Sequence, residues 1–488
     1  MIHLWNYSRL VSDNVPLPPV YRHVDRRGVA QNLARFVFPH ELELLARELL
    51  LHADRSERKA HRSIRDWYVL AESMNAIKGY ANDVFDANKS GGVMLTLHRL
   101  AHQQFPRFSI ITASKIGRYL ALYRHQALSE VFERRIGVDV DSYFVMAFAT
   151  IAATTQRPST NTQTDYSVLG IEDSTSRLFF SRIVGGIDQV RKKLIEDQRL
   201  GDTWEYTFNA LHYKPLIAFN SLHPERAICP VPPLLERRLT DGIFFDLYES
   251  GSGFEKAYGD AVENIVGRML ASLPQSFDTY KPDPLTIGKS SFAGCDWIVA
   301  EHESYAFVEC KAKRIASKAR VADRLKDLQD ELRYLADAVV QNYLNLHRWA
   351  SHDPKIAKKK GPSYCIVVTL EDWLLFSPVA TGTLEKLVSV GLEKHGISEE
   401  LATKSPYLVM GSESFQKAVA ALRVHPMSDV FGGLDLPKYK GWLPSTYLHD
   451  RYPDIESNDV GAFSTEFQGL LDYVMASAEV RENSYSPE

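Results

Sequence analysis

The chain contains few cysteines, and their spacing excludes several kinds of site. Only Cys229, Cys295, Cys310 and Cys365 occur among 488 residues, and no two of them form a C-x-x-C pair. A structural zinc site or a dithiol redox centre normally needs such a pair. We therefore expect free, buried thiols in a reducing compartment.

Long hydrophobic runs, a strong charge excess and a nucleotide-binding loop are also absent from the sequence. No run of 18 apolar residues appears, and the start MIHLWNYSRLVSDN lacks the basic and apolar regions of a signal peptide. We expect a cytoplasmic protein without membrane contact. The net charge of -4 means that any nucleic-acid contact must come from a local basic patch. Without G-x-x-x-x-G-K-[ST], an ATP-driven motor is not expected.

A chain of this length is too long for a single hydrophobic core. Changes in residue composition and periodicity along it predict four regions. Helical periodicity dominates the first part, whereas clustered prolines and short β-rich runs follow it. We expect a helical N-terminal region, an extended connector, an α/β domain, and a loop-rich tail that ends in a helix. Their expected bounds are 1–213, 214–250, 251–430 and 431–488.

The third region alternates helices and strands. The order of its first elements is a helix at 253–273, strands at 294–301 and 305–313, a long helix at 320–349 and a strand at 362–372. This order predicts a mixed sheet flanked by helices. Apolar residues recur along the long helix at spacings of three and four, so we expect it to pack against the sheet as one continuous element.

Three charged residues interrupt the two strands that should be buried. In YAFVECKAK the side chains alternate, so Glu309 and Lys311 share the face of Tyr305 and Phe307. The polar link EHES suits a hairpin, which places Asp296 beside Glu309. Two converging carboxylates raise each other's pKa unless a cation lies between them. Hard oxygen ligands favour Mg²⁺ or Mn²⁺ over zinc, and Lys311 could stabilise negative charge there.

The pattern of Asp296, Glu309 and Lys311 across a hairpin, after an acidic helix, resembles the PD-(D/E)xK phosphodiesterase superfamily. The resemblance covers about 254–370, and Cys295 replaces the proline of the nominal pattern. It implies a restriction-endonuclease-like fold and metal-dependent hydrolysis of nucleic acid. Asp296, Glu309 and the carbonyl of Cys310 would bind the metal, and Lys311 would activate water. An acid on the preceding helix would complete the site, with Glu263 preferred and Glu255 the alternative.

Basic residues gather directly after this motif. Those expected to contact phosphates are Lys313, Arg314, Lys318 and Arg320. The alternative is a solvated helix face. Three weaker candidates are the run KIAKKKG from Lys355, Gln341 on the long helix, and the segment TASKIGRYLALYRH as a DNA-recognition helix.

Taken together, the sequence predicts an α/β nuclease domain, restriction-endonuclease-like, preceded by a mostly α-helical N-terminal region. We expect a Mg²⁺- or Mn²⁺-dependent endonuclease acting on DNA. The resemblance extends to bacterial restriction and antiphage effectors, to dimers that cut both strands, and to a protein partner held by the helical region. Two alternatives remain open: a nuclease that cleaves RNA, and a binding or scaffold protein that retains the fold. An isolated E-x-K triplet is common on solvent-exposed strands, so the surrounding elements carry the hypothesis.

Overall fold

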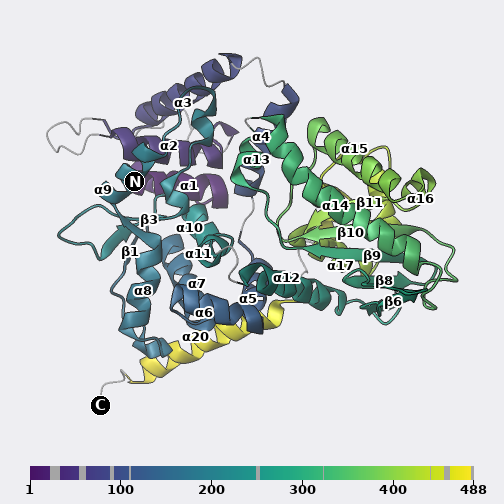
Figure 1. Cartoon of the computed structure of the whole chain (residues 1–488). Coiled ribbons are helices and arrows are strands. Elements are labelled where there is room, and N and C mark those ends of the chain that lie inside the picture. Colours follow the sequence, from purple (N-terminus) through teal and green to yellow (C-terminus); the bar gives the residue numbers. More distant parts are fainter. Residues whose placement is uncertain are drawn as a thin grey trace.

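The structure is a computed structural model of the whole chain. It describes residues 1–21, 33, 35–53, 62–87, 93–108, 111–248, 253–322, 324–439, 441–455 and 462–484. Helices predominate in the N-terminal half, and a five-stranded sheet with helices on both faces forms the other half (Figure 1). The chain is thus a mixed helix and sheet protein, as the sequence predicts at this level.

The N-terminal half contains nine α-helices within the described residues. They are α1 (Ile2–Asp13), α2 (Pro39–His52), α3 (Trp67–Ala87), α4 (Val93–Gln104), α5 (Ala113–Tyr123), α6 (Gln126–Ile136), α7 (Val140–Gln156), α8 (Asp173–Ile183) and α9 (Ile187–Glu196). No single described helix is long and apolar enough to span a membrane; only α6 and α7 taken together, with a bend of 68°, meet that test of length and composition.

The described part of the expected connector, residues 214–248, contains folded elements where the prolines suggested an extended chain. It contains strands β3 (Leu216–Ala218) and β4 (Arg226–Ile228) and helices α10 (Pro232–Arg238) and α11 (Ile243–Leu247). The strands join β1 (Ser159–Asn161) and β2 (Val184–Gly186) in a sheet of order β1-β4-β3-β2. The apolar side chains of this segment are buried against the N-terminal helices, which is why it folds with them.

The second half is built on a mixed sheet of order β11-β10-β9-β8-β5. Strands β5, β8 and β9 are successively antiparallel, whereas β9, β10 and β11 are parallel. The bounds are α12 (Phe254–Leu270), β5 (Phe277–Tyr280), β6 (Leu285–Ile287), β7 (Ser290–Phe292), β8 (Trp297–Glu301), β9 (Ser304–Lys311), α13 (Ser317–Val321), α14 (Leu325–Trp349), β10 (Ser363–Thr369), α15 (Pro378–Lys394), α16 (Glu399–Lys404), β11 (Tyr407–Gly411) and α17 (Ser412–Leu422).

The two faces of the sheet are covered by different helices. On one face Tyr305 and Phe307 of β9 pack with α14 and α15, and on the other Ala306 and Val308 pack with α12 and α17. The expected antiparallel hairpin and its alternation are therefore confirmed. The packing of the long apolar stripe against the sheet is confirmed too. The helix itself is interrupted, however, because α13 ends at Val321 and Ala322 has a φ of 46°.

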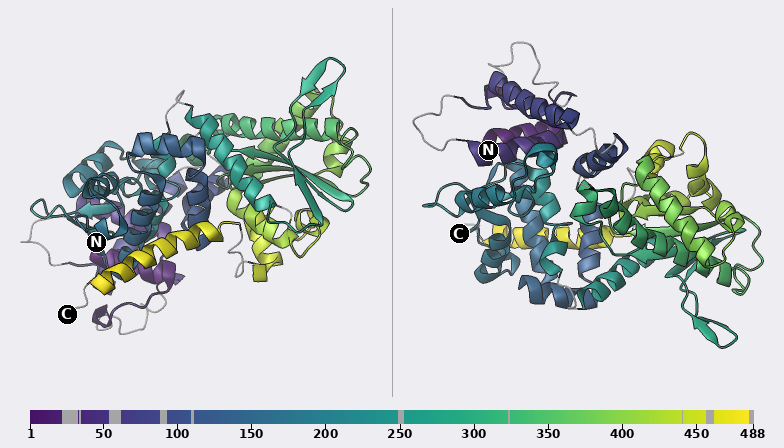
Figure 2. Two further views of the ribbon diagram at one scale, coloured as in Figure 1. Left: turned by 90° about the horizontal axis from the view of Figure 1, so that it is seen from below. Right: turned by 45° about the horizontal axis from the view of Figure 1, so that its top comes forward.

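The C-terminal segment returns to the N-terminal half. It contains α18 (Met427–Val430), α19 (Pro444–Arg451) and α20 (Ser464–Ser484), and α20 lies along α5 and α7 (Figures 1 and 2). Phe463 and Leu470 are buried there in a hydrophobic cluster that runs from α5 through α12 to the sheet. The two halves consequently share one continuous core.

Candidate active site at the end of the β8–β9 hairpin

The hairpin register brings Asp296 and Glu309 together. Trp297 pairs with Val308, so one further step places Asp296 opposite Glu309, at the carboxyl end of β9. The backbone N–H of Cys310 donates a hydrogen bond to Asp296 Oδ2 at 2.6 Å. Both carboxylates therefore lie where the parallel strands β9 and β10 end, which is the edge at which ligands bind in many α/β sheets.

Lys311 is held beside the same pair. Its Nζ lies 2.7 Å from Glu309 Oε1, and both side chains are largely buried. Burial alone would lower the pKa of Lys311, but the Glu309 carboxylate outweighs it and the pKa is raised above the ordinary lysine value. Lys311 is accordingly a fixed positive charge at the site.

The pKa values of both carboxylates are raised above the ordinary values. Burial raises the pKa of Glu309, and repulsion from Asp296 raises it further, against the opposing effect of Lys311. Burial also raises the pKa of Asp296, with Glu263 adding to the shift and the Cys310 N–H opposing it. The described residues form no ion pair with Asp296. The site thus holds more negative charge than its own cations neutralise.

The helix α12 contributes the third acid. Glu263 acts electrostatically on both Asp296 and Glu309, and it forms an ion pair with Lys281, whose ammonium also lies over the ring of Trp297. Glu255 is exposed in the first turn of α12 and has no described interaction with the pair. Of the two acids weighed from the sequence, the structure brings Glu263 to the site.

The donor set suits a hard divalent cation, although the side chains are not arranged around one. Among the described residues no group of three or more His, Cys, Asp or Glu side chains is close enough to hold a metal ion. Carboxylate oxygens with raised pKa values, facing each other in a buried place, are nevertheless the chemistry that Mg²⁺ or Mn²⁺ relieves. Asp296 and Glu309 would hold the ion, with Glu263 beside them.

The role of Cys310 is carried by its backbone. Its side chain packs on the α12 face of the sheet, and burial raises the pKa of the thiol far above its ordinary value. The N–H of Cys310 is the group seen to bond Asp296, whereas the sequence-based expectation concerned its carbonyl as a metal ligand. The thiol also hydrogen-bonds Asp296, which adds to the rise of its own pKa.

The four basic residues after the motif differ in exposure. Lys318 is exposed on α13, and Lys313 lies 3.2 Å from Glu331 and over the ring of Tyr334. The side chain of Arg314 is only 8% exposed and pairs with Glu371, so it is less accessible to a phosphate than the sequence-based expectation required. Arg320 remains partly exposed, with its guanidinium 3.0 Å from Glu371. Lys318 and Lys313 are the better-placed candidates for a phosphate.

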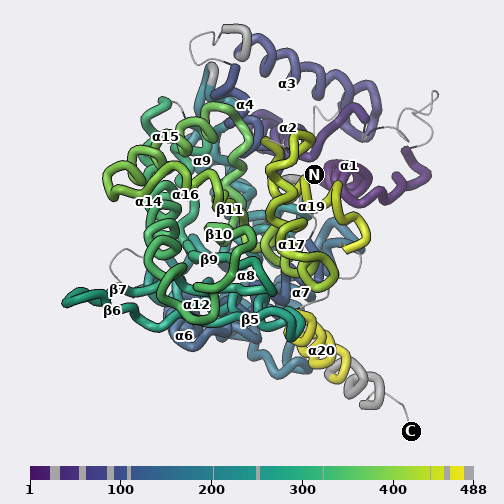
Figure 3. Tube along the Cα trace, turned by 90° about the vertical axis from the view of Figure 1, so that its right-hand side faces the viewer, coloured from purple at the N-terminus to yellow at the C-terminus, as the bar shows by residue number. Residues whose placement is uncertain are grey.

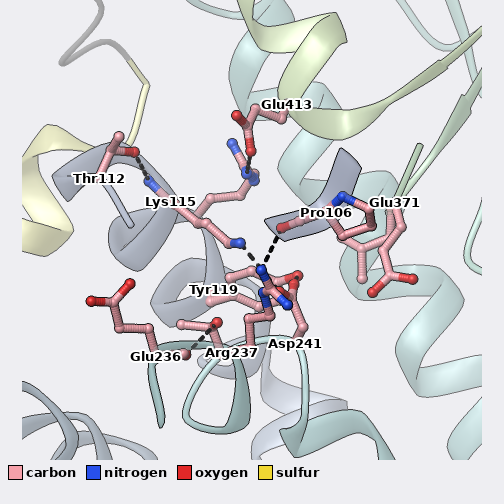
Figure 4. Close-up of polar contacts among 12 residues, drawn as sticks. Pro106, Thr112, Lys115, Tyr119, Glu236, Arg237, Asp241, Glu371 and Glu413 are labelled. Carbon is pink, nitrogen blue, oxygen red and sulfur yellow. Dashed lines mark hydrogen bonds and ion pairs between the residues drawn. The ribbon is translucent and has the colours of Figure 1, made fainter. Parts of the chain in front are cut away.

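Arg314 belongs to a buried polar network between the two halves. It donates to the Asp241 carbonyl at 2.6 Å and pairs with the Glu371 carboxylate. Lys115 and Tyr119 of α5 bind the Asp241 carboxylate (Figure 4). Burial would raise the pKa of Asp241, but Lys115 and Arg314 lower it to about 2. This network joins α5 to the segment that follows Lys311.

This network could not be predicted from the sequence. Lys115 and Asp241 are 126 residues apart, and Arg314 and Glu371 are 57 apart. No local spacing or periodicity relates residues at such separations. Only the continuous core, which packs α5 against α12, brings them together.

The three weaker candidates lie elsewhere. Helix α5, considered as a DNA-recognition helix, is buried from Ile116 to Tyr123 and cannot enter a groove. Gln341 donates to Asn345 at 3.1 Å on the same helix. The run at Lys355 lies by the β8–β9 turn, where Lys360 N–H donates to Glu303, at the opposite end of the hairpin from Asp296.

Comparison with known proteins adds no relative: no protein-family model, no curated protein and no solved structure matches this chain. Any function must therefore be argued from the site.

Proposed function

We propose that this chain is a metal-dependent nuclease that hydrolyses phosphodiester bonds of DNA. The observation that carries the proposal is the pair of the partly buried Asp296 and the buried Glu309, with Lys311 bonded to Glu309. Buried like charges are costly and persist where a function uses them. The mixed sheet, with helices on both faces and these charges at its carboxyl edge, supports the PD-(D/E)xK resemblance.

Each residue would have a distinct role. Asp296 and Glu309 bind the cation, and Glu263 adds negative charge from α12. The cation, when bound, supplies a Lewis acid for the phosphoryl oxygen and lowers the pKa of water. Lys311 directs its ammonium at the attacking water or the scissile phosphate and stabilises the negative charge that develops there. The N–H of Cys310 fixes the orientation of the Asp296 carboxylate.

The test is a cleavage assay on the full chain. Supercoiled plasmid, linear DNA and single-stranded RNA are incubated with wild type or Asp296→Asn in Mg²⁺, Mn²⁺ or EDTA. We expect metal-dependent cleavage of DNA by wild type. Asp296→Asn should lose at least about 100-fold in rate, because the cation that Asp296 would hold stabilises the transition state by several kcal/mol.

Asp173→Asn is the matched control, because Asp173 is an exposed acid on α8, remote from the sheet. It should cleave like wild type. Equal cleavage by wild type and Asp296→Asn on every substrate would overturn the nuclease proposal. Cleavage of RNA alone would replace DNA by RNA as the substrate.

A further inference from the structure

The small hairpin β6–β7 stands outside the main sheet. Its strands pair only with each other, Leu285 with Phe292, Thr286 with Ser291 and Ile287 with Ser290. It projects from the body of the protein in two different views (Figures 2 and 3). All residues from Thr286 to Ser291 are exposed, which is unusual for a segment with an ordered strand pairing. The tip of the hairpin, residues 286–291, therefore contributes nothing to the buried core.

The hairpin is nevertheless rigidly built. Gly288 has a φ of 63° and precedes Lys289 in a two-residue turn, the arrangement in which glycine at the first position matches the twist of the strands. At the base, Leu285 and Phe292 pack against the core, and the guanidinium of Arg348 lies 4.1 Å from the centre of the Phe292 ring. Lys289 is thus presented at the tip of an anchored ribbon.

Both stems of the hairpin lead directly to the candidate active site. Lys281, before β6, pairs with Glu263 and covers Trp297. After β7, only three residues separate Phe292 from Asp296. A polymer whose phosphodiester lies at Asp296 would therefore extend past this hairpin.

The dimensions of the ribbon match one groove of a nucleic-acid duplex. Three residues beyond the Leu285–Phe292 anchor extend about 10 Å, against a depth of about 8.5 Å for the major groove of B-form DNA. Two strands about 4.8 Å apart fit a groove about 12 Å wide, but not the minor groove of about 6 Å. The major groove of A-form RNA is too narrow for side chains to read.

The exposed side chains have the corresponding chemistry. Thr286, Ser290 and Ser291 carry hydroxyl groups and Lys289 an ammonium, and no carboxylate lies between Leu285 and Phe292. Hydroxyl and ammonium donors are the groups that contact phosphates and base edges in DNA complexes.

We propose that the β6–β7 hairpin enters the major groove of duplex DNA and positions the strand to be cut at Asp296, with Lys289 as its principal contact. The inference rests on the proposed nuclease function and narrows its substrate to duplex DNA. Lys289 is a positioning and binding residue, since it does not touch the reacting atoms.

The test compares the full-length variants Lys289→Ala, Lys289→Arg and the double variant Thr286→Ala, Ser291→Ala. One labelled strand is supplied alone, in a DNA duplex and in an RNA duplex of the same sequence. We expect wild type to prefer the DNA duplex. Lys289→Ala should raise KM for that duplex about tenfold with kcat retained, and should lower the slope of log binding constant against log salt by about one. Lys289→Arg, which keeps a cationic donor, should largely restore KM.

Lys394→Ala, which removes an exposed lysine from the end of α15, is the matched control and should behave as wild type. The hairpin inference is overturned if Lys289→Ala and the double variant keep the wild-type KM and salt slope, or if wild type prefers the RNA duplex or the single strand. In those cases metal-dependent cleavage lost in Asp296→Asn still upholds the nuclease function. If wild type cleaves nothing, both proposals fail.

Discussion

Asp296 is the carboxylate on which the charge balance of the site depends. Glu309 pairs with Lys311 and Glu263 pairs with Lys281, whereas Asp296 forms no ion pair among the described residues and is bonded by the N–H and the side chain of Cys310. Three acids thus face two lysines. A buried carboxylate without a cation costs free energy, and a raised pKa expresses that cost.

The first prediction follows from this balance. Because the folded state raises the pKa of Asp296, its ionised form destabilises the protein above the ordinary carboxyl pKa, and the cost disappears on acidification. Asp296→Asn should therefore have a higher Tm than wild type at pH 7.5 in EDTA, with the difference vanishing toward pH 4. Mg²⁺ or Mn²⁺ at 100 times Kd should stabilise wild type by about 2.7 kcal/mol and leave Asp296→Asn unaffected. A wild-type Tm indifferent to both ions would contradict the metal assignment.

A second acid with a raised pKa, Glu236 on α10, allows a sharper test of pH dependence. Burial raises its pKa to about 7, with Asp13 adding to the shift and Lys115 opposing it. The carboxyl is protonated in the folded state below pH 7, so its cost appears as the pH rises from about 4.5 to above 7. Glu236→Gln should increase the free energy of unfolding by on the order of 1–3 kcal/mol at pH 8 and change little at pH 5. Denaturant unfolding at both pH values measures this, and an equal effect at both would refute the assigned pKa.

Among the helices and strands, those with regular apolar periodicity can be predicted from the sequence, whereas the short polar strands cannot. Alternation along β9 predicted its faces, and the acidic helix α12 lies where its apolar stripe indicated. Strands β5, β6 and β7 have three or four residues each and no buried alternation, so nothing in the sequence marked them. The break between α13 and α14 was missed because its cause lies on another helix, α4.

That cause is a pair of side chains which cap α13. Arg99 of α4 donates to the carbonyls of Val321 at 2.7 Å and Ala322 at 3.0 Å, and His98 Nε2 lies 2.9 Å from the Ala319 carbonyl. The last carbonyls of a helix have no partner within the helix, and a cation there is also favoured by the helix dipole. Helix α4 therefore fixes the end of α13, directly after the candidate catalytic residues.

The third prediction concerns this cap. Arg99→Ala leaves two buried carbonyls without their donor and should lower the free energy of unfolding by on the order of 2–4 kcal/mol. Arg333→Ala, which removes an exposed arginine from α14, should change it by less than about 0.5 kcal/mol. Equal, small effects of both substitutions in urea denaturation would show that the cap contributes nothing.

For the molecule as a whole, the four regions expected from the sequence contribute to a shared hydrophobic core. The cluster of buried residues that includes Tyr119 and Phe132 also includes Tyr258 of α12 and Val308 of β9. Composition and periodicity predict where one type of secondary structure gives way to another along the chain. They carry no information on which buried faces pack against each other. For the same reason Asp296, Glu309 and Lys311 could be predicted within one hairpin, whereas Lys115, Asp241 and Glu371 could not.

The fourth prediction tests this continuity. A fragment of residues 251–430 would expose the side of α12 that packs against α5 and α6, including Phe254 and Tyr258. Exposed apolar surface of that kind favours aggregation, so the fragment should be poorly soluble or lack a cooperative unfolding transition. Thermal unfolding followed by circular dichroism decides the point. A fragment as stable as the same region in the full chain would show that residues 251–430 have a hydrophobic core of their own.

The most direct test of the nuclease proposal is to measure the rate at which Lys311→Met cleaves duplex DNA in Mg²⁺. The end groups of the products are analysed in the same experiment. Lys386→Met, which alters an exposed lysine on α15, is the matched control. We expect wild type and Lys386→Met to yield identical fragments with 5′-phosphate ends, and Lys311→Met to be slower by about 100-fold or more while it remains folded. Wild-type rates in Lys311→Met, or an absence of metal-dependent cleavage in wild type, would contradict the proposal.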